Sequence, residues 1–178
     1  MNYLYLHGFR SSPQSKKGVA FDAYFAPRGI AWQRLDLREP LRLSAMIAKA
    51  AGQLGDGAVI AGSSLGGLTA AWTAARDPRV QKLILMAPAF QLVSRWKDAV
   101  PDADPDFIAD VARIDVGFPR IEVPTLIFHG IHDASVPVQF SRDFAAQHPG
   151  ARLIELDDDH ELVASLPVIL PEVERFLA

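Results

Sequence analysis

Short apolar runs alternate with helical segments along the whole chain, and this alternation constrains the fold more than any other feature. Six runs predict strands, at residues 2–8, 31–37, 57–62, 80–88, 123–130 and 151–157. Segments with helical spacing lie between them, and another, at 166–178, ends the chain. Nearly continuous apolar runs are typical of parallel strands that are buried on both faces. The sequence therefore predicts an α/β fold, with a mainly parallel six-stranded sheet and helices on both faces.

The composition excludes several classes of protein. A chain of 178 residues predicts one domain over 1–178, and 49% hydrophobic residues suffice for a core. A net charge of −3 gives no reason to expect a nucleic acid partner or an anionic membrane. The absence of cysteine excludes disulfides, thiolate metal sites and a cysteine nucleophile. We find no signal peptide and no run that could span a bilayer, so we expect a cytoplasmic protein without stable membrane anchoring.

One segment, at about 91–120, interrupts the alternation of strands and helices. Loops of this length inside a compact domain are uncommon and often functional. Two interpretations remain open for it. It forms a small lid of one or two short helices, or it is a plain crossover helix with an irregular tail.

Polar residues gather where the predicted strands end. The stretches HGFRSS, GSSLGG, HGIHDAS and DDDHE follow four of the strands and contain four of the five histidines. The fifth, His148, falls at a helix end and is expected to interact with the helix dipole. The carboxyl ends of parallel strands share one edge of the sheet, which is where such folds place their functional groups. We therefore expect these four stretches to form one site.

The stretch GSSLGG predicts a sharp turn from strand to helix, with Ser64 at its apex. A side chain on such a turn has a strained backbone, and the residues two before and two after it must be very small. Gly62 and Gly66 meet this requirement around Ser64, whereas Leu65 is too large to flank Ser63. The pattern G-x-S-x-G, placed between an apolar strand and a helix, indicates a serine nucleophile. Gly67 would let the helix pack closely on the sheet.

A serine hydroxyl needs a base, and His160 is the best candidate. It follows the last predicted strand, where a loop can bring it over the edge of the sheet. His7 and His129 each precede a glycine at a strand end and are expected to shape loops. His132 is expected to be only a neighbour of the site.

Asp133 is the predicted acid that orients the His160 ring. It lies just past the strand that precedes the His160 strand, so the two loops can meet. Asp157, Asp158 and Asp159 are closer in sequence, but adjacent residues cannot easily fold back onto the ring. We expect these three to form the loop, as aspartate tolerates left-handed backbone conformations.

Acyl transfer also needs donors for the oxyanion that develops. The backbone N–H of Leu65, directly after the nucleophile, is the first candidate. The second is expected from the loop after the first strand, from the N–H of Phe9 or, alternatively, of Arg10.

The walls of a substrate pocket are less well defined by the sequence. The candidates are Phe9, Phe90, Leu92, Trp96 and Val136. Phe90 and Trp96 fit core or lid packing as well as a pocket. A cluster of basic residues lies near the Phe9 loop: Arg10, Lys16 and Lys17. These residues could favour an acidic substrate, or they could form a solvated basic face. We expect the solvated face.

The stretches YLYLHGFRSSPQSKK, GSSLGG, MAPAF, HGIHDASVP and DDDHEL together resemble the α/β-hydrolase superfamily, and within it small bacterial esterases of the YqiA type. The resemblance implies a compact α/β-hydrolase fold with strand order 2-1-3-4-5-6, which lacks the leading antiparallel strands of larger relatives. It implies catalytic Ser64, Asp133 and His160, in the chain order of that superfamily. Many relatives have a glycine shortly before the histidine, where this chain has aspartates.

The predicted function is a serine hydrolase that cleaves short-chain carboxylic esters or thioesters of small molecules through an acyl-enzyme. We expect no metal and no cofactor, no nucleic acid partner, and a monomer or homodimer. Two other classes remain open: a cofactor-free perhydrolase or C–C hydrolase that uses the same residues, and a binding protein with the hydrolase fold but no activity.

Overall fold

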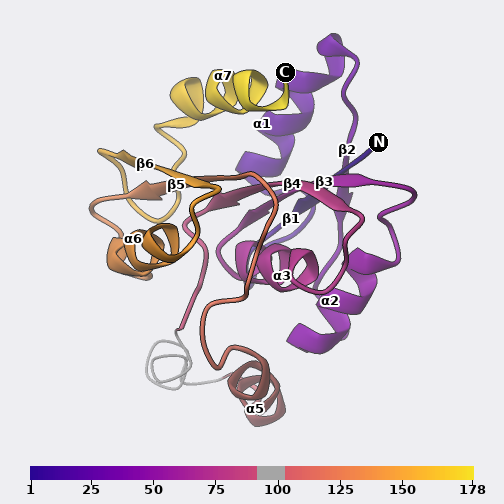
Figure 1. Cartoon of the computed structure of the whole chain (residues 1–178), viewed down its shortest axis with the longest axis vertical. Helices are drawn as coiled ribbons and strands as arrows, with labels where there is room; N and C mark the ends of the chain where they lie inside the picture. Colours follow the sequence, from indigo (N-terminus) through magenta and orange to yellow (C-terminus); the bar gives the residue numbers. More distant parts are fainter. Residues whose placement is uncertain (92–102) are drawn as a thin grey trace.

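The computed structural model describes residues 1–91 and 103–178. Its strands are β1 (Asn2–Leu6), β2 (Trp32–Leu35), β3 (Ala58–Ser63), β4 (Val80–Met86), β5 (Thr125–Gly130) and β6 (Ala151–Leu156). The helices are α1 (Lys16–Phe25), the 3-10 helix η1 (Ala26–Arg28), α2 (Leu43–Ala51), α3 (Leu65–Ala74), α5 (Pro105–Ile114), α6 (Val138–Gln147) and α7 (Leu166–Leu177). Each predicted strand is thus present, as Figure 1 shows.

The six strands form one sheet in the order β2-β1-β3-β4-β5-β6, and every neighbouring pair is parallel. This confirms the predicted α/β fold and its strand order. Because all the strands run in one direction, the loops that follow β1, β3, β5 and β6 leave the sheet at the same edge.

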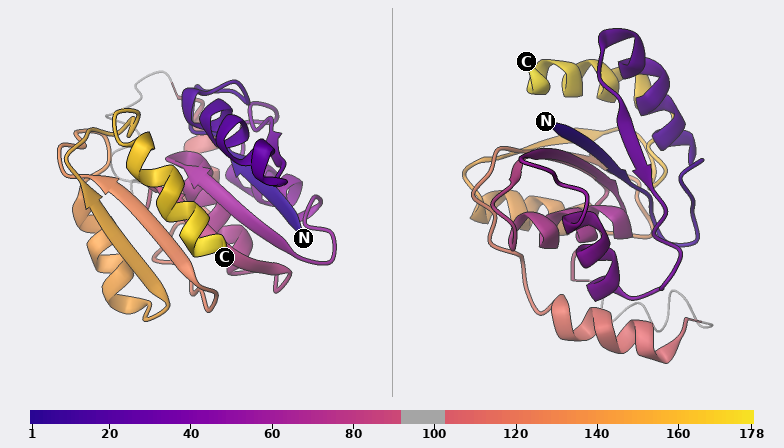
Figure 2. Two further views of the ribbon diagram at one scale, coloured as in Figure 1. Left: turned by 90° about the horizontal axis from the view of Figure 1, so that it is seen from above. Right: turned by 90° about the vertical axis from the view of Figure 1, so that its right-hand side faces the viewer.

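Helices cover both faces of the sheet, as predicted. In Figures 1 and 2, α1 and α7 lie together on one face, while α2, α3 and α6 lie on the other. Side chains alternate along each strand, so successive residues enter different cores. In β4, for example, Leu83 and Leu85 pack in the core beneath α2 and α3, whereas Ile84 and Met86 pack in the core beneath α1 and α7.

Local signals explain where the first helix begins and ends. The Ser15 side chain caps α1 by accepting a hydrogen bond from the Gly18 N–H at 3.2 Å. The helix continues into η1, and Gly29 ends it in the left-handed conformation with φ 77°.

The segment at 91–120 includes residues 92–102, which lie outside the described part of the chain. Its described portion contains α5, which packs beside α2 on the side away from the sheet (Figure 2). The Arg42 guanidinium pairs with Asp104 and Asp106, each at 2.9 Å, and the Asp110 carboxylate accepts from the Ser44 N–H at 2.8 Å. A small lid in this segment stays a prediction.

A membrane span needs a helix that is both long and apolar. Over the described ranges, the helices are all too short or too polar to cross a membrane.

Candidate active site

Ser64 occupies the turn between β3 and α3 in a strained backbone conformation, with φ 55° and ψ −119°. Its N–H donates to the Met86 carbonyl at 2.9 Å, and its carbonyl accepts from the Ala89 N–H at 3.1 Å. The neighbouring strand β4 and the loop after it therefore hold the strained residue in place. Ser64 is partly exposed, whereas Ser63 is buried, so only the second serine faces the solvent at this edge.

The glycines on either side of Ser64 meet the predicted steric requirement. A Cβ atom at Gly62 would overlap the backbone of Gly66, and a Cβ atom at Gly66 would overlap the Leu6 carbonyl of β1. A Cβ atom at Gly67 would lie 3.1 Å from Pro88, in the loop after β4. The turn can therefore form only because positions 62 and 66 have no side chain, while a side chain at position 67 would press against Pro88.

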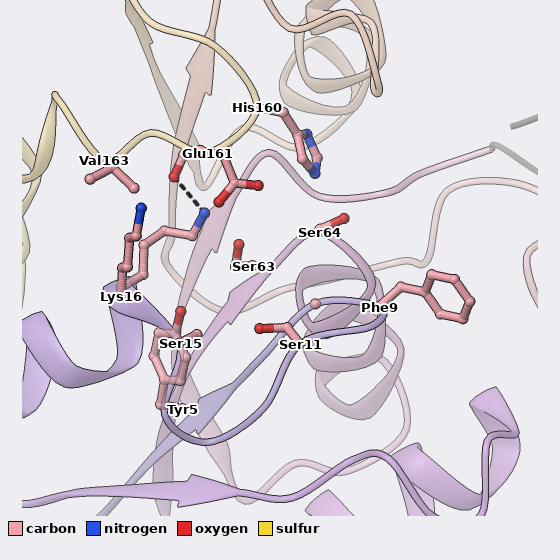
Figure 3. A pocket seen from close by; sticks show the side chains of 12 residues that line it. Tyr5, Phe9, Ser11, Ser15, Lys16, Ser63, Ser64, His160, Glu161 and Val163 are labelled. Carbon is pink, nitrogen blue, oxygen red and sulfur yellow. Dashed lines mark hydrogen bonds between the residues drawn. The ribbon is translucent and has the colours of Figure 1, made fainter. Parts of the chain in front are cut away.

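The structure brings His160 and Asp133 together. The His160 Nδ1 donates to the Asp133 Oδ2 at 2.6 Å, from a ring that is 21% exposed to a carboxylate that is fully buried. This bond leaves the His160 Nε2 facing away from Asp133. His160 and Ser64 line the same hollow, and in Figure 3 the tip of the His160 ring points toward Ser64.

The Asp133 carboxylate is ionised although it is buried. Its Oδ1 accepts from the N–H groups of Ser135 at 2.8 Å and Val136 at 2.7 Å. Its Oδ2 lies near the rings of His160 and His129, the latter at 3.2 Å. Burial raises the pKa of Asp133, but the hydrogen bonds from His129, His160 and Val136 outweigh it and hold the pKa well below its usual range.

His129 is a member of this cluster that the sequence did not reveal. Its ring is fully buried, with Nδ1 2.7 Å from the Ser141 hydroxyl and Nε2 2.9 Å from the Val136 carbonyl. Both the Val136 carbonyl and the Asp133 carboxylate are acceptors, so the proton belongs on Nε2, and Nδ1 accepts from Ser141. The expectation that His129 shapes a loop agrees with these contacts. No sequence pattern indicated that it also supports Asp133.

The loop that carries His160 rests directly on the end of β5. A Cβ atom at Gly130 would overlap the carbonyl oxygens of Asp158 and Asp159, and the His132 N–H donates to the Asp158 carbonyl at 3.1 Å. The Asp158 Oδ2 accepts from the Ser165 N–H at 2.9 Å. These contacts bring the loops after β5 and β6 together.

The aspartates before His160 form the loop, as expected, but by a different means. Asp159 accepts from the Glu161 N–H at 2.8 Å, and Asp157 lies 2.8 Å from the His132 ring at the surface. The expectation of a left-handed aspartate is wrong, because Leu162 is the residue of this loop with a positive φ, at 54°. Asp158 and Asp159 shape the loop by accepting hydrogen bonds from backbone amides.

The loop after β1 lies against Ser64. A Cβ atom at Gly8 would be 3.2 Å from the Ser64 Cβ, so the chain passes the serine at van der Waals contact. Phe9 follows, with its ring stacked on Phe107 of α5 at 5.6 Å. Arg10 has φ 52°, and its guanidinium lies 5.3 Å from the centre of the Phe9 ring. Leu65 is the first residue of α3, where an N–H has no partner within the helix.

The predicted pocket walls are only partly found beside Ser64. Phe9 lines the hollows next to the serine, whereas Phe90 and Val136 are buried in the core. Phe90 stacks on Phe144 at 4.7 Å, which explains its place. Trp96, like Leu92, lies outside the described residues.

The basic residues near the Phe9 loop do not form one solvated face. Arg10 and Lys16 are exposed, but Lys17 is buried, and its Nζ donates to the Glu161 carbonyl at 2.5 Å, the dashed line in Figure 3. The expectation of a solvated face is therefore wrong for Lys17. Its first-turn position in α1 directs it inward, beneath the His160 loop.

Within its described residues, the site offers no group of ligands for a metal ion. No cluster of three or more His, Asp or Glu side chains suited to an ion occurs in residues 1–91 and 103–178.

Comparison with known proteins identified one family model, which matches residues 2–176 and is described as the uncharacterised protein family UPF0227. No curated protein matches the sequence. Many solved structures resemble the chain closely in their backbone.

Three of these structures illustrate the likeness. The mouse alpha/beta hydrolase domain-containing protein 10 is 20% identical, with a TM-score of 0.86 over 99% of this chain and 89% of that protein. A structure from work on the metagenome-derived lipolytic enzymes LipS and LipT is 21% identical, with a TM-score of 0.82 over 98% and 92%. The esterase Pf2001 of Pyrococcus furiosus is 15% identical, with a TM-score of 0.74 over 99% and 80%. At these identities, the likeness establishes the fold.

Proposed function

Since the chain belongs to the family UPF0227 and has the α/β-hydrolase fold, we propose that it is a serine hydrolase that cleaves carboxylic esters or thioesters of small molecules. Ser64 is the nucleophile, His160 the general base and acid, and Asp133 the residue that orients His160. The backbone N–H groups of Leu65 and Phe9 stabilise the oxyanion. Names of the structural relatives, which include an esterase and lipolytic enzymes, agree with this reaction class.

One observation carries the proposal. Ser64 stands in a strained turn and lines the same hollow as His160. The Nδ1 atom of His160 is hydrogen-bonded to the ionised Asp133. A buried carboxylate on Nδ1 fixes the tautomer in which Nε2 can take a proton, and it stabilises the imidazolium that follows. A serine without such a base would be a poor nucleophile.

The mechanism has two halves. His160 Nε2 takes the Ser64 proton while Ser64 Oγ bonds to the carbonyl carbon, and the carbonyl oxygen becomes an oxyanion held by the two N–H groups. The tetrahedral intermediate then collapses, the bond to the leaving oxygen or sulfur breaks, and His160 gives that atom its proton. In the second half, His160 takes a proton from water while the water oxygen bonds to the acyl carbon. The bond to Ser64 Oγ then breaks and His160 returns the proton to Oγ, which releases the acid and restores Ser64.

Phe9 is favoured over Arg10 as the second donor. Gly8 touches Ser64, so the amide that follows it is the nearest in the loop to the reacting carbonyl. Arg10 lies one residue further from Gly8 along the loop and is exposed. Short-chain acyl groups are proposed because the chain is small.

The experiment that tests the proposal is labelling with a fluorophosphonate, combined with hydrolysis of p-nitrophenyl butyrate. Ser64→Ala should abolish labelling and lower kcat by up to about 10⁶-fold, because the whole catalytic unit fails without its nucleophile. Ser63→Ala is the matched control one residue away, and it should keep activity within about tenfold.

Equal losses in both variants would contradict the choice of Ser64. A wild-type protein that is folded by circular dichroism, but neither labelled nor active on any ester, would instead be a binding protein. Faster formation of peracid than hydrolysis would identify a perhydrolase.

A further inference from the structure

Two hollows lie beside the loop after β1, the first lined by Ser64 and the second by the adjacent Leu65, and their walls differ in chemistry. The first, of about 130 Å3, is lined by Ser64, His160 and mostly polar residues, among them Tyr5, Ser11, Ser15, Lys16 and Lys17. The second, of about 310 Å3, is lined by the apolar side chains of Phe9, Leu37, Leu41, Met46 and Leu65, and also by the charged Arg10, Arg38 and Asp104. Gly8 and Phe9 line both, so the loop after β1 separates them. We call them the polar hollow and the apolar hollow.

Resting on the proposed function, we propose that the polar hollow binds the leaving alcohol and the apolar hollow binds the acyl chain, so that the preferred substrates are esters of an apolar acid with a small polyhydroxylated alcohol. The substrate carbonyl would lie over Ser64, between the two hollows. The two halves of the ester then extend in opposite directions.

His160 fixes which half enters which hollow. In the acylation step the leaving oxygen takes the proton that His160 received from Ser64, so it must lie within hydrogen-bond reach of His160 Nε2. His160 lines the polar hollow and not the apolar one. Leu65, whose N–H is proposed to hold the oxyanion, lines the apolar hollow. The leaving alcohol is therefore on the polar side.

The polar hollow can donate several hydrogen bonds to hydroxyl groups. Within the described residues, the Lys17 ammonium uses one of its three N–H donors, toward the Glu161 carbonyl. The Tyr5 hydroxyl is buried beside Ser15 and makes no well-formed hydrogen bond to the residues the structure describes. Burial raises the pKa of Tyr5, so its hydroxyl remains a neutral donor.

Charge favours a neutral polyol over an anionic alcohol. Burial lowers the pKa of Lys17, and the carboxylates of Glu161, Asp159, Asp158 and Asp133 oppose this shift. The ammonium thus already has several negative groups around it. An added carboxylate would meet Glu161, which also lines the hollow. Hydroxyl groups bring no such repulsion, and they match donors and acceptors alike.

The test compares glyceryl 1-monobutyrate with propyl butyrate, two esters with the same acyl group and the same number of carbons in the alcohol. After correction for their rates of alkaline hydrolysis, kcat/KM should favour the glyceryl ester by about tenfold or more, because buried donors left without partners penalise the propyl ester. Lys17→Met should reduce this ratio by about tenfold. Ser11→Ala, which removes another hydroxyl that lines the polar hollow, should reduce it as well.

The ratio separates binding from positioning. If Lys17 only supported the His160 loop, Lys17→Met would slow both esters equally and leave the ratio unchanged, which would overturn the inference. Leu41→Ala in the apolar hollow is the matched control, and it should change the preference between acetate and hexanoate esters but not the ratio.

The same measurements distinguish a failure of the proposed substrate preference from a failure of the proposed hydrolase function. A wild-type enzyme that is labelled at Ser64 and cleaves p-nitrophenyl butyrate, but favours the propyl ester, would overturn the inference while the proposed function stands. Absence of labelling and of activity on every ester would overturn both.

Discussion

The Ser64 turn and the His160 loop face each other across the same hollow, yet different forces hold them. The turn is determined by sterics, because side chains at Gly62 and Gly66 would overlap neighbouring backbone. The His160 loop is held by hydrogen bonds to groups that are distant in the sequence, such as those from Lys17 to the Glu161 carbonyl and from the His132 N–H to the Asp158 carbonyl. A steric requirement admits few residue types, whereas a hydrogen-bonded loop can be built from many. The two regions should therefore respond differently to substitution.

After the loss of the nucleophile itself, the largest expected effect comes from the acid that joins the two regions. Asp133→Asn removes the charge that accepts from both His160 and His129. The amide would present donors to two ring N–H groups, so His160 would lose its tautomer and orientation. We expect kcat on p-nitrophenyl butyrate to fall by about 10⁴-fold, the magnitude known for the corresponding substitution in a protease triad. Circular dichroism should show that the fold is kept.

Asp157→Asn is the matched control for this substitution. Asp157 is exposed and contacts the His132 ring at the surface, so its loss should change kcat by less than about tenfold. A severe loss in Asp157→Asn, combined with a nearly silent Asp133→Asn, would show that the acid lies in the loop before His160.

The next prediction compares the Ser64 turn with the His160 loop by adding one methyl group at a glycine in contact with each, and by measuring stability and activity. In Gly66→Ala the Cβ atom would overlap the Leu6 carbonyl at the end of β1, and we expect the free energy of unfolding to fall by about 3 kcal/mol or more. In Gly130→Ala it would overlap the Asp158 and Asp159 carbonyls and displace the His160 loop. Here we expect a smaller loss of stability, but a fall in kcat of about 10²-fold. Urea unfolding and steady-state kinetics measure the two quantities.

Gly117→Ala provides the baseline, since a Cβ atom there meets nothing within 4 Å. If Gly66→Ala folded normally and lost only activity, or if Gly130→Ala unfolded the protein to the same degree, the distinction between a steric turn and a hydrogen-bonded loop would be wrong.

The same distinction explains what the sequence could predict. The strands and the Ser64 turn follow from apolar periodicity and glycine placement, which leave a record in residue types. The order of the strands was instead implied by the family resemblance. The His160–Asp133 pair was predicted because the two residues follow consecutive strands, in the chain order of the hydrolase superfamily, and the structure has a hydrogen bond between them. The contact of His129 with Asp133 and the burial of Lys17 depend on how distant elements pack, and neither has a local pattern. Phe90 was a candidate for the pocket but is buried in the core. An aromatic residue after a strand fits either place, and the sequence does not distinguish them.

The smallest effect concerns Asp158, one of the hydrogen-bonding groups of the His160 loop. Burial opposes its ionisation, but the N–H groups of Ser165 and Asp159 and the charge of Lys17 prevail and lower its pKa. A carboxyl whose pKa is lower in the folded state stabilises the protein above its usual pKa, and this contribution is lost as the pH falls. Asp158→Asn keeps an acceptor but loses the charge. We therefore expect a loss of about 0.5 to 1 kcal/mol near pH 7, which shrinks below about pH 4, and a change in kcat of less than about tenfold. Urea unfolding of both proteins at several pH values measures it. A loss that grows as the pH falls would contradict the proposed role of this charge, and a loss as large as that of Gly66→Ala would show that a single bond, rather than many, holds the loop.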